Sequence, residues 1–417
     1  MVLVTTSKNH LKALSRGELI HSITPSYRAL PCSKNQGMAH PQAHINPTML
    51  RWARGRVGFD LQVAAKAAHV KPEQLESWEM GDGFPTFKQA QNVAHALHAP
   101  FGFFFLQQPP EEPPLLPDLR TVGGAPVDKP SVNLLDTVKH TLQRQAWYAE
   151  YQQDQGAQPL PFIAKFQTNT APNIVANDIR QVLGVDIEQG QRQRDDYQRE
   201  LIQGAEAAGI LVMRSGIVGN NTRRKLDVGE FRGFAISHAV APVVFINAAD
   251  APAARLFTLL HELAHLWLGS SGISNAAPGN THQVEVACNA IAGEFLAPAE
   301  TFTQAWANAA PELPVRLAEV AKRFHVSQMV VMRRALDLGL IDRETYTQFY
   351  LAELARFREA DSKGGSFYRN AGSKNSARFA KAVIAEAFSG RLLLRDAGKL
   401  LGVQPAKLRT FADQLPA

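Results

Sequence analysis

The stretch FTLLHELAHLWLG (257–269) constrains this chain most, because it places two histidines four positions apart within an apolar run. On a helix, positions i and i+4 lie on one face about one turn apart. His261 and His265 can therefore direct both imidazoles at one metal ion, while Glu262 lies beside them and can polarise the attacking water. The five letters alone do not decide the matter, since an amphipathic helix with histidines at its polar edge shows the same pattern.

A catalytic zinc site built on two histidines needs a third protein ligand. In HQVEVACNAIAGEFLAP (282–298), Glu285 lies 20 residues after His265 on a second expected helix, and Asn289 follows one turn later. A hydrogen-bonding group at that position can hold a ligating imidazole in its orientation. We therefore predict Glu285 as the third ligand and Asn289 as its supporting residue.

Other ligand candidates stay open at this point. Glu294 competes with Glu285 but lies close to the helix end set by Pro298, and His282 lies where a loop meets the helix. Four further residues carry weaker signals: His238 and His325, expected to be structural, Cys288, expected to be a small buried apolar residue, and Cys32, a thiol that can cap an open zinc site.

Composition places the chain among globular proteins. It has 417 residues, enough for two to four domains, and 45% of them are hydrophobic and 20% charged. Two cysteines fit a reducing compartment, no apolar run reaches the roughly 18 residues of a membrane span, and residues 1–37 lack the pattern of a secretory signal. We expect a cytoplasmic protein without a membrane partner, whose first residues are a flexible arm or precede a start at Met38.

Short β-branched and aromatic runs predict three strands, at 209–215, 231–237 and 242–247, just before the HELAH helix. Residues 131–151, 173–183 and 194–208 are expected to be helical. The last strand has two interpretations. It is either an ordinary core strand or an edge strand on which an extended peptide pairs, with Val243, Phe245 and Asn247 as substrate-binding candidates.

Residues 47–98 read as short helices joined by tight turns, which is typical of a helix-turn-helix unit. The expected recognition helix, 71–83, carries four acidic residues against Lys71 alone, a composition that disfavours contact with phosphates. The start of the unit supplies the tentative nucleic-acid contacts, namely Arg51, Arg54 and Arg56. Docking of a protein partner or dimerisation is the favoured role of this unit.

Residues 314–341 show helix-turn-helix spacing a second time, with Arg333 and Arg334 as tentative nucleic-acid contacts. A helical buttress for the preceding domain is the equally weighted alternative. The positive charge gathers further on, because residues 363–417 hold ten Lys/Arg and three Asp/Glu while the whole chain carries +6. This basic end is the better candidate for any DNA contact.

The run RGFAISHAVAPVVFINAADAPAARLFTLLHELAHLWLG, with Glu285, Asn289 and EFLAP after it, resembles the ImmA/IrrE family of metallopeptidase-like regulators. The front part, with its WE.G ending at 78–81, is similar to the XRE-type helix-turn-helix module. The resemblance covers roughly residues 47–345. It departs from the family at Ala287, where a second acidic residue is common, and at Ile291, where an aromatic is common.

The resemblance implies that His261, His265 and Glu285 bind zinc and that Glu262 is the general base. It also implies a partner substrate, since the family cleaves or inactivates transcriptional repressors that control stress response, mobile elements or toxin–antitoxin pairs.

We expect an α+β, mostly helical fold with six segments. They are a flexible arm (1–45), an XRE-like helix-turn-helix bundle (46–100), a Pro-rich linker (101–130), a zincin-like metallopeptidase domain with a small sheet and the HExxH helix (131–310), a helix-turn-helix-like region (311–360) and a basic helical C-terminal region (361–417).

Two functional hypotheses follow. The favoured one is a site-specific endopeptidase that uses Zn²⁺, with Mn²⁺ as an alternative metal, and cleaves an XRE-type repressor or the product of an adjacent gene. The other is a DNA-binding or antitoxin-like scaffold whose zinc site is structural or weakly active. Glu262 favours the enzyme, because a structural site gains nothing from a carboxylate that does not ligate.

Overall fold

The structure is a computed structural model that describes residues 41–110, 130–185, 194–274, 283–324, 326–359 and 374–415. Most of the expected arm and much of the expected linker lie outside these ranges, as do Cys32, His282 and His325. Within the described ranges, no helix is long and apolar enough to cross a membrane.

The N-terminal unit is a set of short helices around its own core. Its elements are α1 (Pro47–Val57), α2 (Leu61–Ala68), α3 (Pro72–Met80), α4 (Phe87–Ala96) and the 3₁₀ helix η1 (Phe101–Phe105). Asp60 caps α2 by accepting a hydrogen bond from the Val63 amide, and Gly81 ends α3 in the left-handed region at φ 87°. Four helices therefore form where the sequence predicts them, while assignment to the XRE type stays a prediction.

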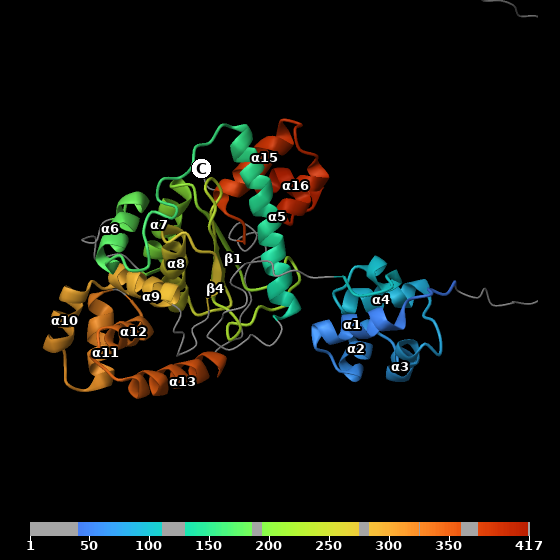
Figure 1. Ribbon diagram of the computed structural model, residues 1–417, viewed down its shortest axis with the longest axis horizontal. Helices are drawn as coiled ribbons and strands as arrows, with labels where there is room; N and C mark the ends of the chain where they lie inside the picture. The colour runs from blue at the N-terminus through green and yellow to red at the C-terminus, as the bar shows by residue number, and fades with distance from the viewer. Residues whose placement is uncertain are drawn as a thin grey trace, which may run out of the picture.

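A four-stranded sheet organises the second unit (Figure 1). Its strands are β1 (Leu211–Ser215), β2 (Gly233–Ile236), β3 (Val243–Asn247) and β4 (Gly272–Ser274), in the order β1-β3-β2-β4. β1 pairs with β3 in parallel, and the other two pairings are antiparallel. The three predicted strands are confirmed, and the short β4 is an addition that the sequence did not reveal.

Helices cover both faces of this sheet, which explains why every residue of β3 is buried. One face carries α6 (Pro172–Leu183), α7 (Arg194–Ala207), α8 (Pro252–Trp267) and α9 (Gln283–Leu296). The other carries α5 (Val132–Asp154), α15 (Ala377–Phe388), α16 (Leu394–Leu401), the 3₁₀ helix η3 (Pro405–Lys407) and α17 (Leu408–Ala412). Figure 1 shows α8 and α9 on one side of the strands and α5 with α15 on the other.

The C-terminal helices α15–α17 share a hydrophobic cluster with α5 and the sheet, through Phe379, Val383 and Phe411. The sequence does not predict this packing, because α15 begins more than 200 residues after α5 ends and more than 100 residues after the last strand. The segment boundaries stay predictions, but residues 379–411 pack against the sheet-containing unit rather than standing apart from it.

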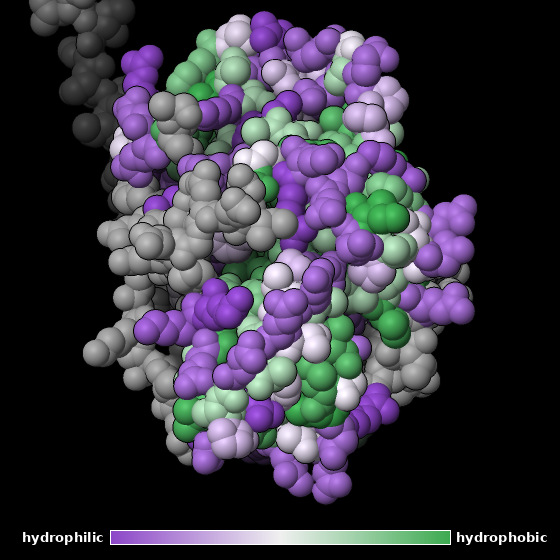
Figure 2. Space-filling model, turned by 90° about the vertical axis from the view of Figure 1, so that its left-hand side faces the viewer, coloured by the Kyte–Doolittle hydropathy of each residue, from purple (hydrophilic) through white to green (hydrophobic). Residues whose placement is uncertain are grey.

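The region after α9 also packs on that unit. It contains α10 (Ala299–Asn308), α11 (Leu313–Arg323), α12 (Gln328–Asp337) and α13 (Arg343–Glu359). Leu317, Val331 and Tyr346 belong to the same buried cluster as the apolar side of α8. This packing favours the buttress interpretation of residues 314–341. On the face of the molecule nearest α6 and α10, hydrophobic side chains form separate patches among polar ones (Figure 2).

Candidate metal centre

Two helices bring three ligand-type side chains together. α8 begins with Pro252 at its first turn, runs along the sheet, and presents His261 and His265 one turn apart. α9 packs against α8 and contributes Glu285 from its first turn. His261, His265 and Glu285 are 3%, 2% and 9% exposed, so the group is sealed from bulk water on most sides.

The distances within this group match a tetrahedral metal site. The Nε2 atoms of His261 and His265 are 3.1 Å apart, and each lies 3.2 Å from one Glu285 carboxylate oxygen. For metal–ligand bonds of about 2.0–2.1 Å, tetrahedral geometry separates ligand atoms by about 3.3 Å. Among the described residues, this is the one His/Cys/Asp/Glu group that is close enough to hold an ion. The residues present therefore fit a metal.

Glu285 and the histidines each shift the pKa of the other toward its charged form. Burial lowers the pKa of His261, but the hydrogen bond and charge of Glu285 outweigh it and raise that pKa overall. Burial likewise raises the pKa of Glu285, and the two histidines outweigh it, holding the pKa well below its usual range. Glu285 is thus an ionised carboxylate, the form that binds a cation.

Each imidazole is held in place through its other nitrogen. Asn289 Oδ1 lies 3.1 Å from His261 Nδ1, the contact expected for a residue one turn after Glu285. Ser270 Oγ lies 2.7 Å from His265 Nδ1. Ser270 is not among the sequence-predicted residues, although a hydroxyl within three residues of the end of the HELAH helix was an available signal. These two contacts direct both Nε2 atoms toward Glu285.

Glu262 lies completely buried beside the ligand group. Its charge helps to raise the pKa of His261 and of the fully buried Cys288 thiol, whose pKa is raised chiefly by burial. Across from it is Gly233 of β2, where a Cβ atom would lie 2.8 Å from Glu262 Oε1 and 2.7 Å from Thr258 Cγ2. Gly233 is therefore a second missed residue, because its missing side chain leaves the space that the Glu262 carboxylate occupies.

The competing third ligand is excluded by its partners. Glu294 forms an ion pair with Arg334 and accepts a hydrogen bond from the Ala299 amide, at the far end of α9 from Glu285. His238 is structural, as expected, since its Nδ1 accepts hydrogen bonds from the amides of Val240 and Ala241.

The edge-strand interpretation of Val243, Phe245 and Asn247 is wrong. β3 lies inside the sheet between β1 and β2, so its backbone groups already pair on both sides. The Asn247 side chain turns the chain instead, donating to the Phe231 carbonyl and accepting from the Ala249 amide. Among the described strands the edges are β1 and β4.

Two of the tentative nucleic-acid arginines are engaged internally. Arg54 forms a two-pronged ion pair with Glu79, at 2.7 and 2.8 Å. Arg334 is 4% exposed and bonds to Glu294 and the Ala297 carbonyl, so its assignment as a DNA contact is wrong. The other three also have internal partners: Arg51 contacts the Glu79 carbonyl, Arg56 the Trp52 ring, and Arg333 the Asp337 carboxylate.

Comparison with protein families agrees with this geometry. Residues 205–336 match the model of the IrrE N-terminal-like domain, peptidase family M78, and residues 375–414 match a domain of unknown function, DUF8813. No curated protein and no solved structure matches the chain. The first match contains the whole ligand group and the buttress helices α11 and α12, and it supports the ImmA/IrrE family for this segment.

Proposed function

We propose that this protein is a zinc-dependent, site-specific endopeptidase in which His261, His265 and Glu285 hold the metal and Glu262 is the general base. The observation that carries the proposal is the set of three ligand atoms 3.1–3.2 Å apart with a buried, non-ligating glutamate beside them. The match of residues 205–336 to a peptidase family supports the same chemistry.

A bound zinc ion would supply Lewis acidity, polarising the scissile carbonyl and lowering the pKa of the attacking water. Glu262 receives the proton of that water and passes it to the departing amine. Asn289 and Ser270 hold the imidazoles in register during this step, since each contacts the Nδ1 atom that faces away from Glu285.

We infer that the substrate is another regulator, an XRE-type repressor or the product of an adjacent gene, bound as an extended strand. With β3 inside the sheet, the edge that suits strand addition is β4. β4 pairs with β2, and its Ser274 lies opposite Gly233, the residue beside Glu262. A peptide paired to β4 therefore lies at the edge of the sheet that is closer to Glu262.

The alternative of a DNA-binding scaffold with a structural metal receives less support. Arg54 and Arg334 hold carboxylates of the chain itself, and α3 is acidic. A structural site also has no use for a buried carboxylate that does not ligate.

The deciding experiment is to incubate the purified full chain with the product of the adjacent gene, with and without Zn²⁺ or Mn²⁺, and to map fragments by mass spectrometry. We expect metal-dependent cleavage at one site by the wild type and none by Glu262→Gln, which keeps its metal. Glu300→Gln, an exposed change on α10, is the matched control and cleaves normally. Equal cleavage by Glu262→Gln would contradict the assigned base, and metal binding without cleavage of any tested regulator would favour the scaffold.

A further inference from the structure

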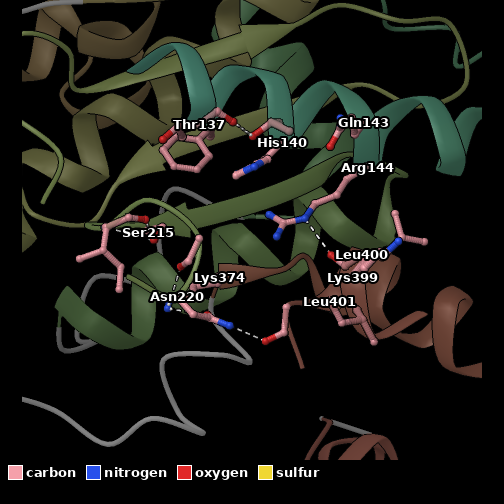
Figure 3. A pocket seen from close by; sticks show the side chains of 15 residues that line it. Thr137, His140, Gln143, Arg144, Ser215, Asn220, Lys374, Lys399, Leu400 and Leu401 are labelled. Atoms are coloured by element: carbon pink, nitrogen blue, oxygen red, sulfur yellow. Dashed lines mark hydrogen bonds between the residues drawn. The ribbon is translucent and has the colours of Figure 1, made fainter. Parts of the chain in front are cut away.

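A cavity of about 200 Å³ lies on the sheet face opposite the metal centre (Figure 3). Its walls come from α5, from the segment that follows β1, and from the C-terminal residues 374–402. Phe245 lines it and belongs to the hydrophobic cluster on the α5 side of the sheet, whereas α8 packs on the other side. This cavity is therefore distinct from the HExxH site.

The lining of this cavity is cationic. Arg144, Lys374 and Lys399 line it, and none of the described residues that line it is Asp or Glu, although Lys399 pairs with Asp396 outside the cavity. His140 also lines it, but burial lowers the pKa of its imidazole, so it adds no charge at neutral pH. Neutral hydrogen-bonding groups make up much of the remainder, among them Thr137, Thr141, Ser215 and Asn220. A partly enclosed space lined by two cations, Arg144 and Lys374, that form no ion pair with the described carboxylates is electrostatically unbalanced, and an anionic ligand removes the imbalance.

Arg144 is placed to provide a two-pronged contact. Its Nε donates to the Leu400 carbonyl at 2.9 Å, which is its one hydrogen bond to the described residues. The terminal amino groups of the guanidinium remain for the cavity, into which Figure 3 shows the side chain reaching from α5. Burial lowers the pKa of Arg144 to about 10, so the side chain still carries its charge at neutral pH.

Lys374 lies across the cavity from Arg144 (Figure 3). Its Nζ donates to the Gly219 carbonyl and to Asn220 Oδ1, both at 3.2 Å, and it forms no ion pair with the described carboxylates. Burial lowers its pKa, and the nearby positive charge of Arg144 lowers it further. Two cations with neutral hydrogen-bond partners thus line one cavity, an arrangement that costs free energy until an anion joins them.

We propose that this cavity binds a small molecule bearing a phosphate group, with the Arg144 guanidinium and the Lys374 ammonium as the principal contacts. Two facing cations suit the double charge of a phosphate better than a single carboxylate. The walls come from segments far apart in the sequence, so the ligand would join the DUF8813 segment to α5 and to the end of β1.

The test is isothermal titration calorimetry on the full chain, with inorganic phosphate in one arm and ribose 5-phosphate in the other, at constant ionic strength. We expect saturable binding in at least one arm, tighter for ribose 5-phosphate if the cavity takes a phosphorylated small molecule and equal if it takes free phosphate. Arg144→Gln and Lys374→Gln should each weaken binding about tenfold or more. Arg395→Gln, an exposed change on α16 outside the cavity, should leave it unchanged.

Thermal unfolding of each variant separates lost binding from lost folding. Arg144→Gln removes a hydrogen bond to the Leu400 carbonyl and can unfold the protein for that reason. In that case Lys374→Gln is the variant that tests the site, because Lys374 contacts only the Gly219 carbonyl and the Asn220 side chain, which lie on one loop. The proposal is overturned by the absence of saturable binding in both arms, or by equal weakening in Arg395→Gln. Displacement of phosphate by duplex DNA with a steep salt dependence also overturns it, in favour of a nucleic-acid surface.

Discussion

Gly233 on β2 and Glu262 on α8 face each other so closely that a Cβ atom at position 233 would lie 2.8 Å from the Glu262 Oε1 atom. The same Cβ would lie 2.8 Å from the Phe245 carbonyl oxygen, which belongs to the neighbouring strand and cannot move independently. The position of the Glu262 carboxylate, the proposed general base, is therefore set by the sheet as well as by the HELAH helix.

Gly233→Ala should displace the Glu262 carboxylate while leaving the ligand group bound to metal. We expect cleavage to fall about 100-fold, because a misplacement near 1 Å has that effect on a catalytic group, and stability to fall by about 1–3 kcal/mol from overpacking. Peptidase assays and metal analysis check this. Gly102→Ala, where a Cβ would meet nothing within 4 Å, is the control. Full activity of Gly233→Ala would show that the contact does not position the base.

Removing a supporting hydrogen bond should weaken the metal site. Asn289→Ala and Ser270→Ala each take a partner from a ligand imidazole, and we expect a 10- to 100-fold loss of zinc affinity, the usual effect of such changes. Competition with a chromophoric chelator measures it. Ser389→Ala, at the end of α15, provides the control. Unaltered affinity in both variants would mean that neither contact steadies the ligands.

Separate substitutions of Glu285 and Glu294 test which of the two glutamates is the third ligand. Glu285→Ala should lose bound metal, since its two oxygens contact both histidines. Glu294→Gln should retain it, because that side chain contacts Arg334 and the Ala299 amide instead. Metal stoichiometry in folded protein distinguishes them, and retention of full stoichiometry in Glu285→Ala would assign the ligand elsewhere.

Arg334→Ala should destabilise the protein strongly, because it leaves the Glu294 carboxylate without its buried partner. We expect a loss of about 3–5 kcal/mol in the free energy of unfolding. The neighbouring Arg333→Ala breaks a more exposed pair with Asp337 and should cost about 1 kcal/mol or less. Chemical denaturation measures both, and the double variant Glu294→Gln/Arg334→Met should recover part of the loss. Similar losses in the two single alanine variants would contradict the proposed difference in burial.

Much of the metal centre could be predicted from the spacing of residues within single helices. The i, i+4 relation of His261 and His265 depends only on helix geometry, so it could be predicted without knowing what surrounds the helix. The same geometry relates Glu285 to Asn289, and the contact of Asn289 with His261 follows once α8 and α9 pack together. Strands and helices were predictable for a similar reason, since short β-branched and aromatic runs, helical periodicity and capping residues act over a few positions.

Relations between distant segments were not predictable from local patterns. A continuous apolar strand has the same letters inside a sheet as at its edge, and only the pairing of β3 with β1 and β2 removed Val243–Asn247 from contact with a substrate. An arginine on a helix looks solvent-exposed until a neighbour covers it, and α9 does this to Arg334 through Glu294.

The sequence by itself determined the candidates for the metal site, because two histidines share one expected helix and two glutamates share the next. Tertiary structure decided the remainder: that Glu285 and not Glu294 faces the histidines, that Gly233 makes room for Glu262, and that Arg144 and Lys374, 230 residues apart, line one cavity. The physical reason is the distance along the chain over which each kind of interaction acts. Helix geometry and capping act within a turn or two, whereas steric fit and the pairing of buried charges depend on packing between segments that sequence spacing does not encode.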